Sequence, residues 1–327
     1  MLATEETTQQ LAALPNMKVI AGAPLKNYTR FGIGGPAAVY AETPDSDSFV
    51  EALGLVQSEA LPYVVIGGGT NLIVSDYGYS GIVLRFTAHS LRHQGTSVYA
   101  DAGADLQELV DYSIDHGLRG IETMTGIPGS VGAAVYGNAG AYGHSIMESV
   151  SSVHFFDGES VRSFDNAQCE FHYRESVFKR HKEWVIFSTE LRLQPAPAAE
   201  LREIADGILK IRNQKYPPTM KCAGSIFKNL ILAELPPSVR EAVPAKVIRE
   251  GKVPSAYFLE QVGAKGLKNG DIHVADYHAN LIYNVGEGTA RELTEVIDLL
   301  KSRVQDRFGL ELEEEVQYVG FDMRASG

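Results

Sequence analysis

The stretch over residues 126–143 constrains this chain more than any other part of its sequence. It holds six glycines in eighteen residues, with no acidic or basic side chain and little bulk. Such a segment cannot build a hydrophobic core, but its backbone can lie flat against a ligand and offer N–H groups to it. The sequence therefore predicts a binding loop here.

A second glycine-rich loop lies upstream, in the sequence Val-Ile-Gly-Gly-Gly-Thr-Asn over residues 65–71. It follows a short apolar strand predicted over residues 63–66, but it lacks both Gly-x-Gly-x-x-Gly and the Gly-Lys-Ser/Thr of a P-loop. One such loop alone is explained equally well as a tight turn. Two in one chain favour one large anionic ligand, a dinucleotide, whose pyrophosphate lies against the backbone amides.

Length, charge and cysteine content limit the classes of protein to which this chain can belong. The 327 residues suggest two or three domains, and the net charge of −12 argues against a general nucleic-acid binder. The two cysteines, Cys169 and Cys222, stand far apart, which excludes a disulfide framework and fits a reducing cytosol. We see no signal peptide, no apolar run of membrane-spanning length and no metal-ligand cluster, so we expect a cytoplasmic protein without membrane or metal.

Hydrophobic spacing predicts several helices and strands along the chain. The helices are expected over residues 45–59, 105–116, 201–213 and 289–308. The last of these has the capping-box residues Thr289 and Glu292 before it ends at Gly309. Strands are expected over residues 81–86, 150–156, 184–193 and 315–319. Residues 1–16 read as a loose arm, and 230–254, with four prolines, as an irregular insertion.

The two loops resemble the FAD-binding segments of the UDP-N-acetylenolpyruvoylglucosamine reductase family, which acts in peptidoglycan precursor synthesis. Further motifs of that family occur in the expected order, at residues 27–37, 173–179, 223–229 and 315–320. The resemblance implies an α+β protein with an FAD-binding fold of the vanillyl-alcohol-oxidase/PCMH type. It implies FAD-binding subdomains over 17–86 and 87–198, and a substrate-binding domain over 199–327.

The resemblance also implies non-covalent FAD, NADPH as reductant and a monomeric protein. The residues expected to bind FAD come from the two glycine-rich loops. They are Ile66, Gly67, Gly68, Gly69, Thr70, Asn71, Leu72, Thr125, Gly126, Pro128, Gly129, Ser130, Gly132, Asn138, Ala139 and Gly140.

The implied reaction sends a hydride to C3 of an enolpyruvyl ether and leaves an enolate at C2, which needs charge stabilisation and a proton. By resemblance, Arg174 holds the substrate carboxylate, Ser225 protonates C2 and Glu315 works beside the arginine. A guanidinium suits the first role because it binds a carboxylate bidentately. Glu315 stands among other acids, and an error of one residue in register would assign its role to Glu314.

The same resemblance implies contacts with the UDP-sugar substrate. They are expected from Tyr173, Lys215, Lys228, Asn229 and His278. On spacing alone, each lysine is better explained as a solvated surface charge, and Arg174 as a surface ion pair.

The chain departs from the family pattern after residue 229, where Leu230 replaces a proline and a long stretch follows. The short span between Arg174 and Ser225 is similar to the family branch that lacks an extra tyrosine-bearing loop. We therefore hypothesise that 230–254 covers the substrate pocket. Two alternatives stay open: another FAD-dependent oxidoreductase of the same fold that uses oxygen, and a non-catalytic protein that binds flavin or a sugar nucleotide.

Overall fold

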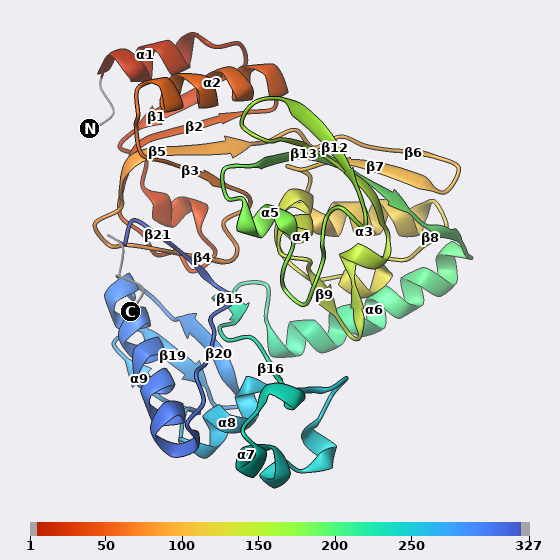
Figure 1. Cartoon of the computed structure of the whole chain (residues 1–327), viewed down its shortest axis with the longest axis vertical. Helices are drawn as coiled ribbons and strands as arrows, with labels where there is room; N and C mark the ends of the chain where they lie inside the picture. Colours follow the sequence, from red (N-terminus) through yellow and green to blue (C-terminus); the bar gives the residue numbers. More distant parts are fainter. Residues whose placement is uncertain (1–4, 322–327) are drawn as a thin grey trace. The chain divides into compact units, whose positions relative to one another are not determined.

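The computed structural model describes residues 5–321 and divides into two compact units, which we describe separately (Figure 1). Unit 1 comprises residues 1–23, 37–69 and 80–218, and unit 2 comprises 24–36, 70–79 and 219–327. This division differs from the predicted boundary at residue 199. Helix α6 (Ala198–Lys215) belongs to unit 1, because its Leu201 and Ala205 are buried in the core of that unit.

A four-stranded sheet forms the first layer of unit 1. In spatial order its strands are β1 (Lys18–Ala21), β2 (Ala37–Thr43), β5 (Tyr79–Phe86) and β3 (Tyr63–Ile66). Two helices, α1 (Glu5–Ala13) and α2 (Ser46–Ser58), cover one face of this sheet (Figure 1). The parallel pairing of β3 with β5 fixes where the chain leaves the sheet at Ile66 and enters the first glycine-rich loop.

The second layer of unit 1 is a five-stranded antiparallel sheet. In spatial order its strands are β12 (Val161–Asp165), β11 (Val150–Phe156), β13 (Val185–Arg192), β7 (Ser97–Asp101) and β6 (Leu91–Gln94). Its core is shared with helices α3 (Leu106–Asp115), α4 (Val131–Tyr136), α5 (Val177–Arg180) and α6. Two short pairs complete the unit: β8 (Leu118–Arg119) with β14 (Gln194–Pro195), and β9 (Gly140–Ala141) with β10 (His144–Ser145).

Unit 2 is built on another antiparallel sheet. Its strands, in spatial order, are β15 (Lys221–Ser225), β20 (His278–Asn284), β19 (Ile272–Ala275) and β18 (Lys268–Asn269). Helix α8 (Ser255–Gln261) packs on β20, and α9 (Ala290–Phe308) packs on β18 and β19. Strand β21 (Gln317–Val319) runs parallel to β4 (Leu72–Val74), so residues 317–319 lie beside the segment that follows the first glycine-rich loop.

Local sequence signals explain the best-predicted helices. In α9, Thr289 and Glu292 form the predicted capping box, and Gly309 ends the helix in the left-handed conformation at φ 66°. The five apolar residues at helical spacing are all buried, namely Leu293, Val296, Ile297, Leu300 and Val304. Helix α2 is capped by Asp45, whose carboxylate accepts a hydrogen bond from the Ser48 amide.

The loose arm predicted over residues 1–16 is wrong for the part that the structure describes. Residues 5–13 form α1, and Leu11 is fully buried in the core that α2 shares with the four-stranded sheet. Thr7, also fully buried, donates a hydrogen bond from its hydroxyl to Glu59. Burial by tertiary contacts therefore orders a segment whose polar composition suggests solvent; residues 1–4 lie outside the described part.

The insertion predicted as irregular over residues 230–254 contains short regular elements. They are β16 (Leu230–Ile231), a 3₁₀ turn over Leu232–Glu234, α7 (Pro237–Ala242), a second 3₁₀ turn over Ala245–Val247 and β17 (Lys252–Val253). Leu230 pairs with Val253, so the two ends of the insertion meet in one antiparallel ladder. The prolines begin or precede these short turns, where their fixed φ is tolerated.

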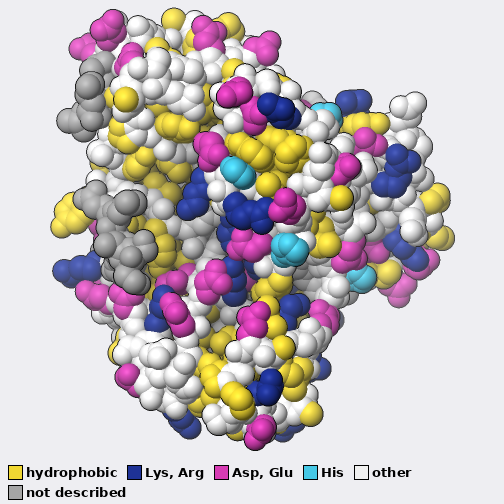
Figure 2. Space-filling view, viewed as in Figure 1, with side chains coloured by type: hydrophobic (Ala, Val, Ile, Leu, Met, Phe, Trp, Pro, Cys, Tyr) yellow, Lys and Arg dark blue, Asp and Glu magenta, His cyan; other side chains and the backbone are white. Residues whose placement is uncertain are grey.

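Charged side chains of both signs occur on the surface. On the displayed face, lysine and arginine side chains are interspersed with aspartate and glutamate (Figure 2). Of the helices within residues 5–321, none combines the length and the apolar character that crossing a bilayer requires.

Replacing Leu11 with alanine tests the burial of α1. We expect the free energy of unfolding to fall by about 2–5 kcal/mol, because a buried leucine leaves a cavity when it is truncated. Denaturant unfolding followed by circular dichroism measures the change. The exposed neighbour Gln10→Ala serves as the control, with an expected change of about 0.5 kcal/mol or less. Equal stability of the two variants would show that α1 is a loose arm.

Candidate active site

The two glycine-rich loops lie against each other within unit 1. A Cβ atom on Gly67 would stand 2.8 Å from the Ser130 hydroxyl oxygen, and one on Gly68 would stand 3.4 Å from the Cα atom of Gly129. A side chain at position 67 would therefore crowd the Ser130 hydroxyl, whereas a Cβ at position 68 would make an ordinary van der Waals contact. The structure thus brings together the candidate residues 67–69 and 129–130, which the sequence separates by sixty positions.

Backbone amides at this contact are available for a ligand. Within residues 5–321, the N–H groups of Gly68, Gly69 and Gly129 donate no hydrogen bond to another protein group. Clustered N–H groups of this kind form an anion-binding concavity. The pyrophosphate of a dinucleotide such as FAD fits this donor set, because it needs several N–H groups and close approach to the backbone.

Other candidate residues of the second loop have structural partners. The Gln107 side-chain oxygen accepts hydrogen bonds from the Thr125 hydroxyl at 3.2 Å and from the Gly126 amide at 2.6 Å. Ser130 caps α4 by accepting from the Ala133 amide. Gly132 donates to the Ala102 carbonyl at 2.9 Å. These bonds fix the path of the loop.

Arg174 stands at the tip of a tight turn in unit 1. His172 and Glu175 close the turn through two reciprocal backbone hydrogen bonds of 3.0 and 3.1 Å. Arg174 has a φ of 58°, the left-handed region that non-glycine residues seldom occupy, at a cost of about 1–2 kcal/mol. Strained backbone of this kind is frequent at functional sites, so the conformation supports a functional hypothesis for this residue.

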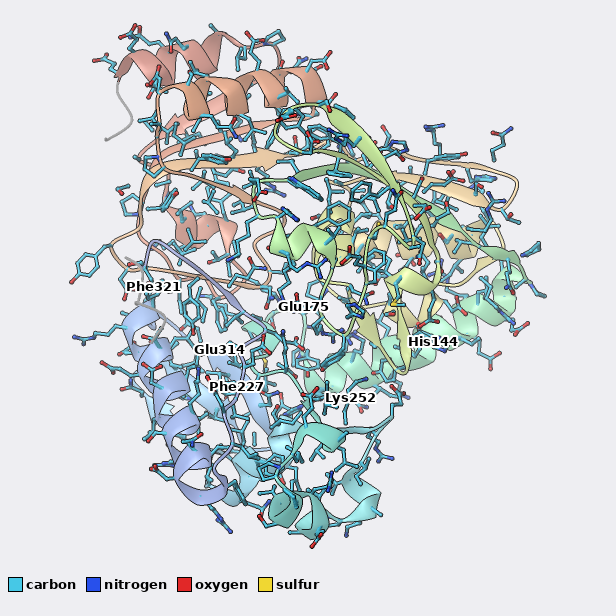
Figure 3. The ribbon with its side chains drawn as sticks, viewed as in Figure 1. His144, Glu175, Phe227, Lys252, Glu314 and Phe321 are labelled. Carbon is cyan, nitrogen blue, oxygen red and sulfur yellow. The ribbon has the colours of Figure 1, made fainter. Side chains whose placement is uncertain are left out.

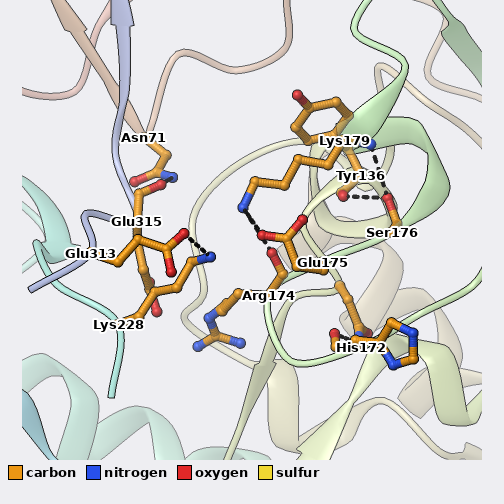
Figure 4. Close-up of polar contacts among 11 residues, drawn as sticks. Asn71, Tyr136, His172, Arg174, Glu175, Ser176, Lys179, Lys228, Glu313 and Glu315 are labelled. Carbon is orange, nitrogen blue, oxygen red and sulfur yellow. Dashed lines mark hydrogen bonds and ion pairs between the residues drawn. The ribbon is translucent and has the colours of Figure 1, made fainter. Parts of the chain in front are cut away.

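The second glycine-rich loop holds this turn from two sides. The Asn138 side-chain amide, from a residue only 3% exposed, donates to the His172 carbonyl at 2.7 Å. The Arg174 guanidinium donates to the Gly140 carbonyl at 3.1 Å and lies 5.4 Å from the ring centre of Tyr173. Figure 4 shows the turn with the side chains around it. The Asn138 side chain thus joins the loop to the arginine turn, and its contact with FAD stays a prediction.

Ser225 ends strand β15 in unit 2, beside Leu281 of β20. The pairing is irregular between Cys222 and Ser225, and Gly224 between them has a φ of 80° that glycine adopts freely. The next residues are held by Asn280, which is 3% exposed: its side chain accepts from the Phe227 amide and donates to the Phe227 carbonyl, both at 2.9 Å. The backbone after Ser225 is therefore firmly placed.

Glu315 lies beside this segment. Its amide donates to the Ile226 carbonyl at 2.7 Å, and its carbonyl accepts from the Asn71 side chain at 2.8 Å. Phe227 and Glu314 form the adjoining backbone bridge and lie next to each other in Figure 3. Ser225 and Glu315, predicted as catalytic residues from segments ninety positions apart, thus come from neighbouring backbone stretches of one unit.

The acidic residues around Glu315 have different partners. Glu313 pairs with Lys228 at 2.5 Å, where the lysine side chain is 10% exposed, and Glu314 pairs with Lys301 of α9 at 3.1 Å (Figure 4 shows the first pair). Glu314, the alternative in register, is therefore engaged with helix α9.

The remaining candidates divide between the units. Tyr173 and Lys215 belong to unit 1, and the Lys215 ammonium lies 5.0 Å from the ring centre of Tyr216. Lys228, Asn229 and His278 belong to unit 2, where the His278 ring nitrogen accepts from the Asn280 amide at 3.1 Å. Burial raises the pKa of the Cys222 thiol, which keeps the group protonated and unreactive.

Several residues that hold the site were not found from the sequence. Gln107 and Lys301 contact the candidates Gly126 and Glu314, which are 19 and 13 positions away, and Asn280 contacts Phe227, 53 positions away in the motif over residues 223–229. No motif surrounds them, and only the tertiary pairing shows their role. Lys179 is different, since it lies inside the family motif over residues 173–179, although its position in the motif does not predict a role.

Comparisons with known proteins agree with this site. A family model described as FAD binding domain matches residues 37–160, and one described as UDP-N-acetylenolpyruvoylglucosamine reductase, C-terminal domain, matches residues 216–319. The UDP-N-acetylenolpyruvoylglucosamine reductase of Solibacter usitatus is 62% identical over 311 residues, covering 95% of this chain and all of that protein. The one from Rubrobacter xylanophilus is 36% identical, covering 91% of this chain and 94% of that protein.

A solved structure extends the likeness to the fold. The crystal structure of UDP-N-acetylenolpyruvylglucosamine reductase from Thermus caldophilus has a TM-score of 0.71 at 27% identity, covering 93% of this chain and 98% of that one. The α+β fold and the FAD-binding domain expected from the sequence are confirmed. Together they define an FAD-containing oxidoreductase. The chain belongs to the UDP-N-acetylenolpyruvoylglucosamine reductase family.

Replacing Gly67 with alanine tests the contact between the loops. The added methyl group would stand 2.8 Å from the Ser130 hydroxyl, so the loops must separate and FAD binding should weaken about tenfold. Fluorescence titration of the apoprotein with FAD measures the affinity. Gly54→Ala is the matched control, because nothing lies within 4 Å of its added Cβ and it stands in helix α2. Unchanged affinity in Gly67→Ala would show that the loop contact does not shape the FAD site.

Proposed function

We propose that this chain catalyses the NADPH-dependent reduction of UDP-N-acetylglucosamine enolpyruvate to UDP-N-acetylmuramate, as a cytoplasmic monomer in peptidoglycan precursor synthesis. The observation that carries the proposal is the 62% identity, over 95% of the chain, to a UDP-N-acetylenolpyruvoylglucosamine reductase. FAD, held without a covalent bond by the two glycine-rich loops, supplies the transfer of a hydride from NADPH to C3 of the enolpyruvyl group.

Arg174 holds the substrate carboxylate in this proposal. A guanidinium keeps its charge and presents two parallel N–H donors, which suit a carboxylate and the negative charge that spreads onto it from the enolate. The turn between His172 and Glu175 supports this role, because it fixes the arginine backbone before substrate arrives. A preorganised donor stabilises developing charge without reorganisation during the reaction.

Ser225 and Glu315 act after hydride transfer, when C2 of the enolpyruvyl group takes up a proton. When hydride reaches C3, the electron pair of the C2–C3 double bond moves onto C2 and its carboxylate. The Ser225 hydroxyl then gives its proton to C2 and regains one from solvent, while Glu315 works beside Arg174 at the enolate. The 2.7 Å bond between the Glu315 amide and the Ile226 carbonyl supports this shared role.

The substrate diphosphate is expected to contact Lys228, Asn229 and His278 of unit 2, with Tyr173 and Lys215 of unit 1 as further contacts. Lys228 is already paired with Glu313 at 2.5 Å. A diphosphate must therefore share this lysine with the carboxylate or displace it. The neighbouring negative charge predicts that diphosphate binding strengthens when Glu313 swings away.

An anaerobic absorbance experiment tests the function. NADPH is added until the flavin bands bleach, and UDP-N-acetylglucosamine enolpyruvate is then added. Recovery of the bands with formation of UDP-N-acetylmuramate is the expected result. Recovery only with oxygen would favour a different FAD-dependent oxidoreductase, and bound flavin that NADPH never bleaches would favour a non-catalytic binding protein.

Ser225→Ala should slow the recovery about 10²–10⁴-fold, the usual contribution of a positioned proton donor. Bleaching by NADPH should keep its rate, since no proton is delivered to C2 in that step. Stopped-flow absorbance separates the two phases. The exposed Ser302→Ala in α9 serves as the control and should leave both phases unchanged. Recovery at the original rate in Ser225→Ala would remove Ser225 from the mechanism.

A further inference from the structure

The carbonyl oxygen of Arg174 has its own partner. The reciprocal bonds between His172 and Glu175 close the turn, and the Asn138 amide ties its first residue to the glycine-rich loop. In the peptide group that follows Arg174, the N–H of Glu175 takes part in the turn, whereas the Arg174 carbonyl is in neither of the two reciprocal bonds. The Lys179 ammonium donates to this carbonyl at 2.9 Å.

Lys179 contacts both residues at the end of the turn. Besides the Arg174 carbonyl, its ammonium pairs with the Glu175 carboxylate at 2.8 Å, as Figure 4 shows. An ion pair four residues apart on a helix is common and contributes little by itself. The bond to the Arg174 carbonyl is not explained by such a pair, because it acts on the backbone of the residue expected to bind substrate.

The backbone of Lys179 is held in place as well. It belongs to α5, whose first turn is capped by the fully buried Ser176. The Ser176 hydroxyl accepts from the Lys179 amide at 3.3 Å and donates to the Tyr136 carbonyl of α4 at 2.7 Å. The lysine side chain is only 21% exposed, so its ammonium has little freedom to leave the turn.

We propose that Lys179 is a positioning residue for substrate binding. It holds the Arg174 peptide in its left-handed conformation and thereby aims the guanidinium at the substrate carboxylate. This inference rests on the proposed function, because the carboxylate-binding role of Arg174 belongs to it. Lys179 itself touches neither FAD nor substrate in this account.

Lys179→Met removes both bonds of the ammonium but keeps an unbranched side chain. We expect the affinity for UDP-N-acetylmuramate, which carries the carboxylate, to fall about tenfold, and kcat/KM for the enolpyruvyl substrate to fall at least as much. Calorimetry on the FAD-loaded protein measures the affinity. FAD content and the rate of bleaching by NADPH should stay unchanged, which a general loss of structure would not allow.

Glu175→Gln is the matched control, because it removes the ion pair and leaves the bond from Lys179 to the Arg174 carbonyl. Its affinity should stay within about twofold of the original protein. Lys179→Arg, which keeps donors on a long side chain, should restore most of the affinity. An equal loss in Glu175→Gln and Lys179→Met would overturn the inference, since the ion pair alone would then explain the effect.

A double-mutant cycle with Arg174→Met separates this inference from the proposed function. If Lys179 acts through Arg174, the double variant should bind no more weakly than Arg174→Met alone. Additive losses would overturn the inference and leave the role of Arg174 intact. Unchanged binding and turnover in Arg174→Met would instead contradict the role of Arg174 and, with it, the inference. Should Lys179→Met yield little folded protein, Lys179→Gln enters the same cycle with the same expectations.

Discussion

The close approach of two backbone segments in unit 1 is the constraint on which the site depends. Where Gly67 meets Ser130, even one methyl group would stand 2.8 Å from the hydroxyl oxygen. A glycine at position 67 avoids this clash, and within residues 5–321 the amides of Gly68, Gly69 and Gly129 donate to no other protein group. One property of the glycines therefore serves both the packing of the loops and the binding of an anionic cofactor.

The loops also support the residues expected to act on substrate. Asn138 and Gly140 of the second loop bond to the turn that carries Arg174, within unit 1. In unit 2, Asn71 bonds to the carbonyl of Glu315. The side-chain amide of each asparagine donates to the backbone of a segment that carries a predicted catalytic residue. The predicted contact of each asparagine with the flavin stays a prediction. A change in either loop should therefore affect flavin binding and substrate chemistry together.

Features determined by neighbouring residues could be predicted from the sequence. Helix α9 needed only its capping box, its apolar spacing and Gly309, all of which lie within twenty-one residues. Helix α1 could not be found this way, because Leu11 is its main apolar anchor and the partners that bury it come from α2 and the sheet. The glycine-rich loops were recognised as binding segments, whereas the roles of Asn138, Asn280 and Lys179 depend on bonds that only the tertiary structure creates.

The acidic end of the chain shows how pairing can single out one residue among similar ones. Glu313, Glu314 and Glu315 are consecutive, and three adjacent carboxylates repel one another unless cations offset their charge. Lys228 pairs with the first and Lys301 with the second, each lysine reaching from a different element. Glu315 is held through its backbone, by the Ile226 carbonyl and the Asn71 side chain. Because Glu314 is already paired with Lys301, we expect Glu315 rather than Glu314 to act with Ser225.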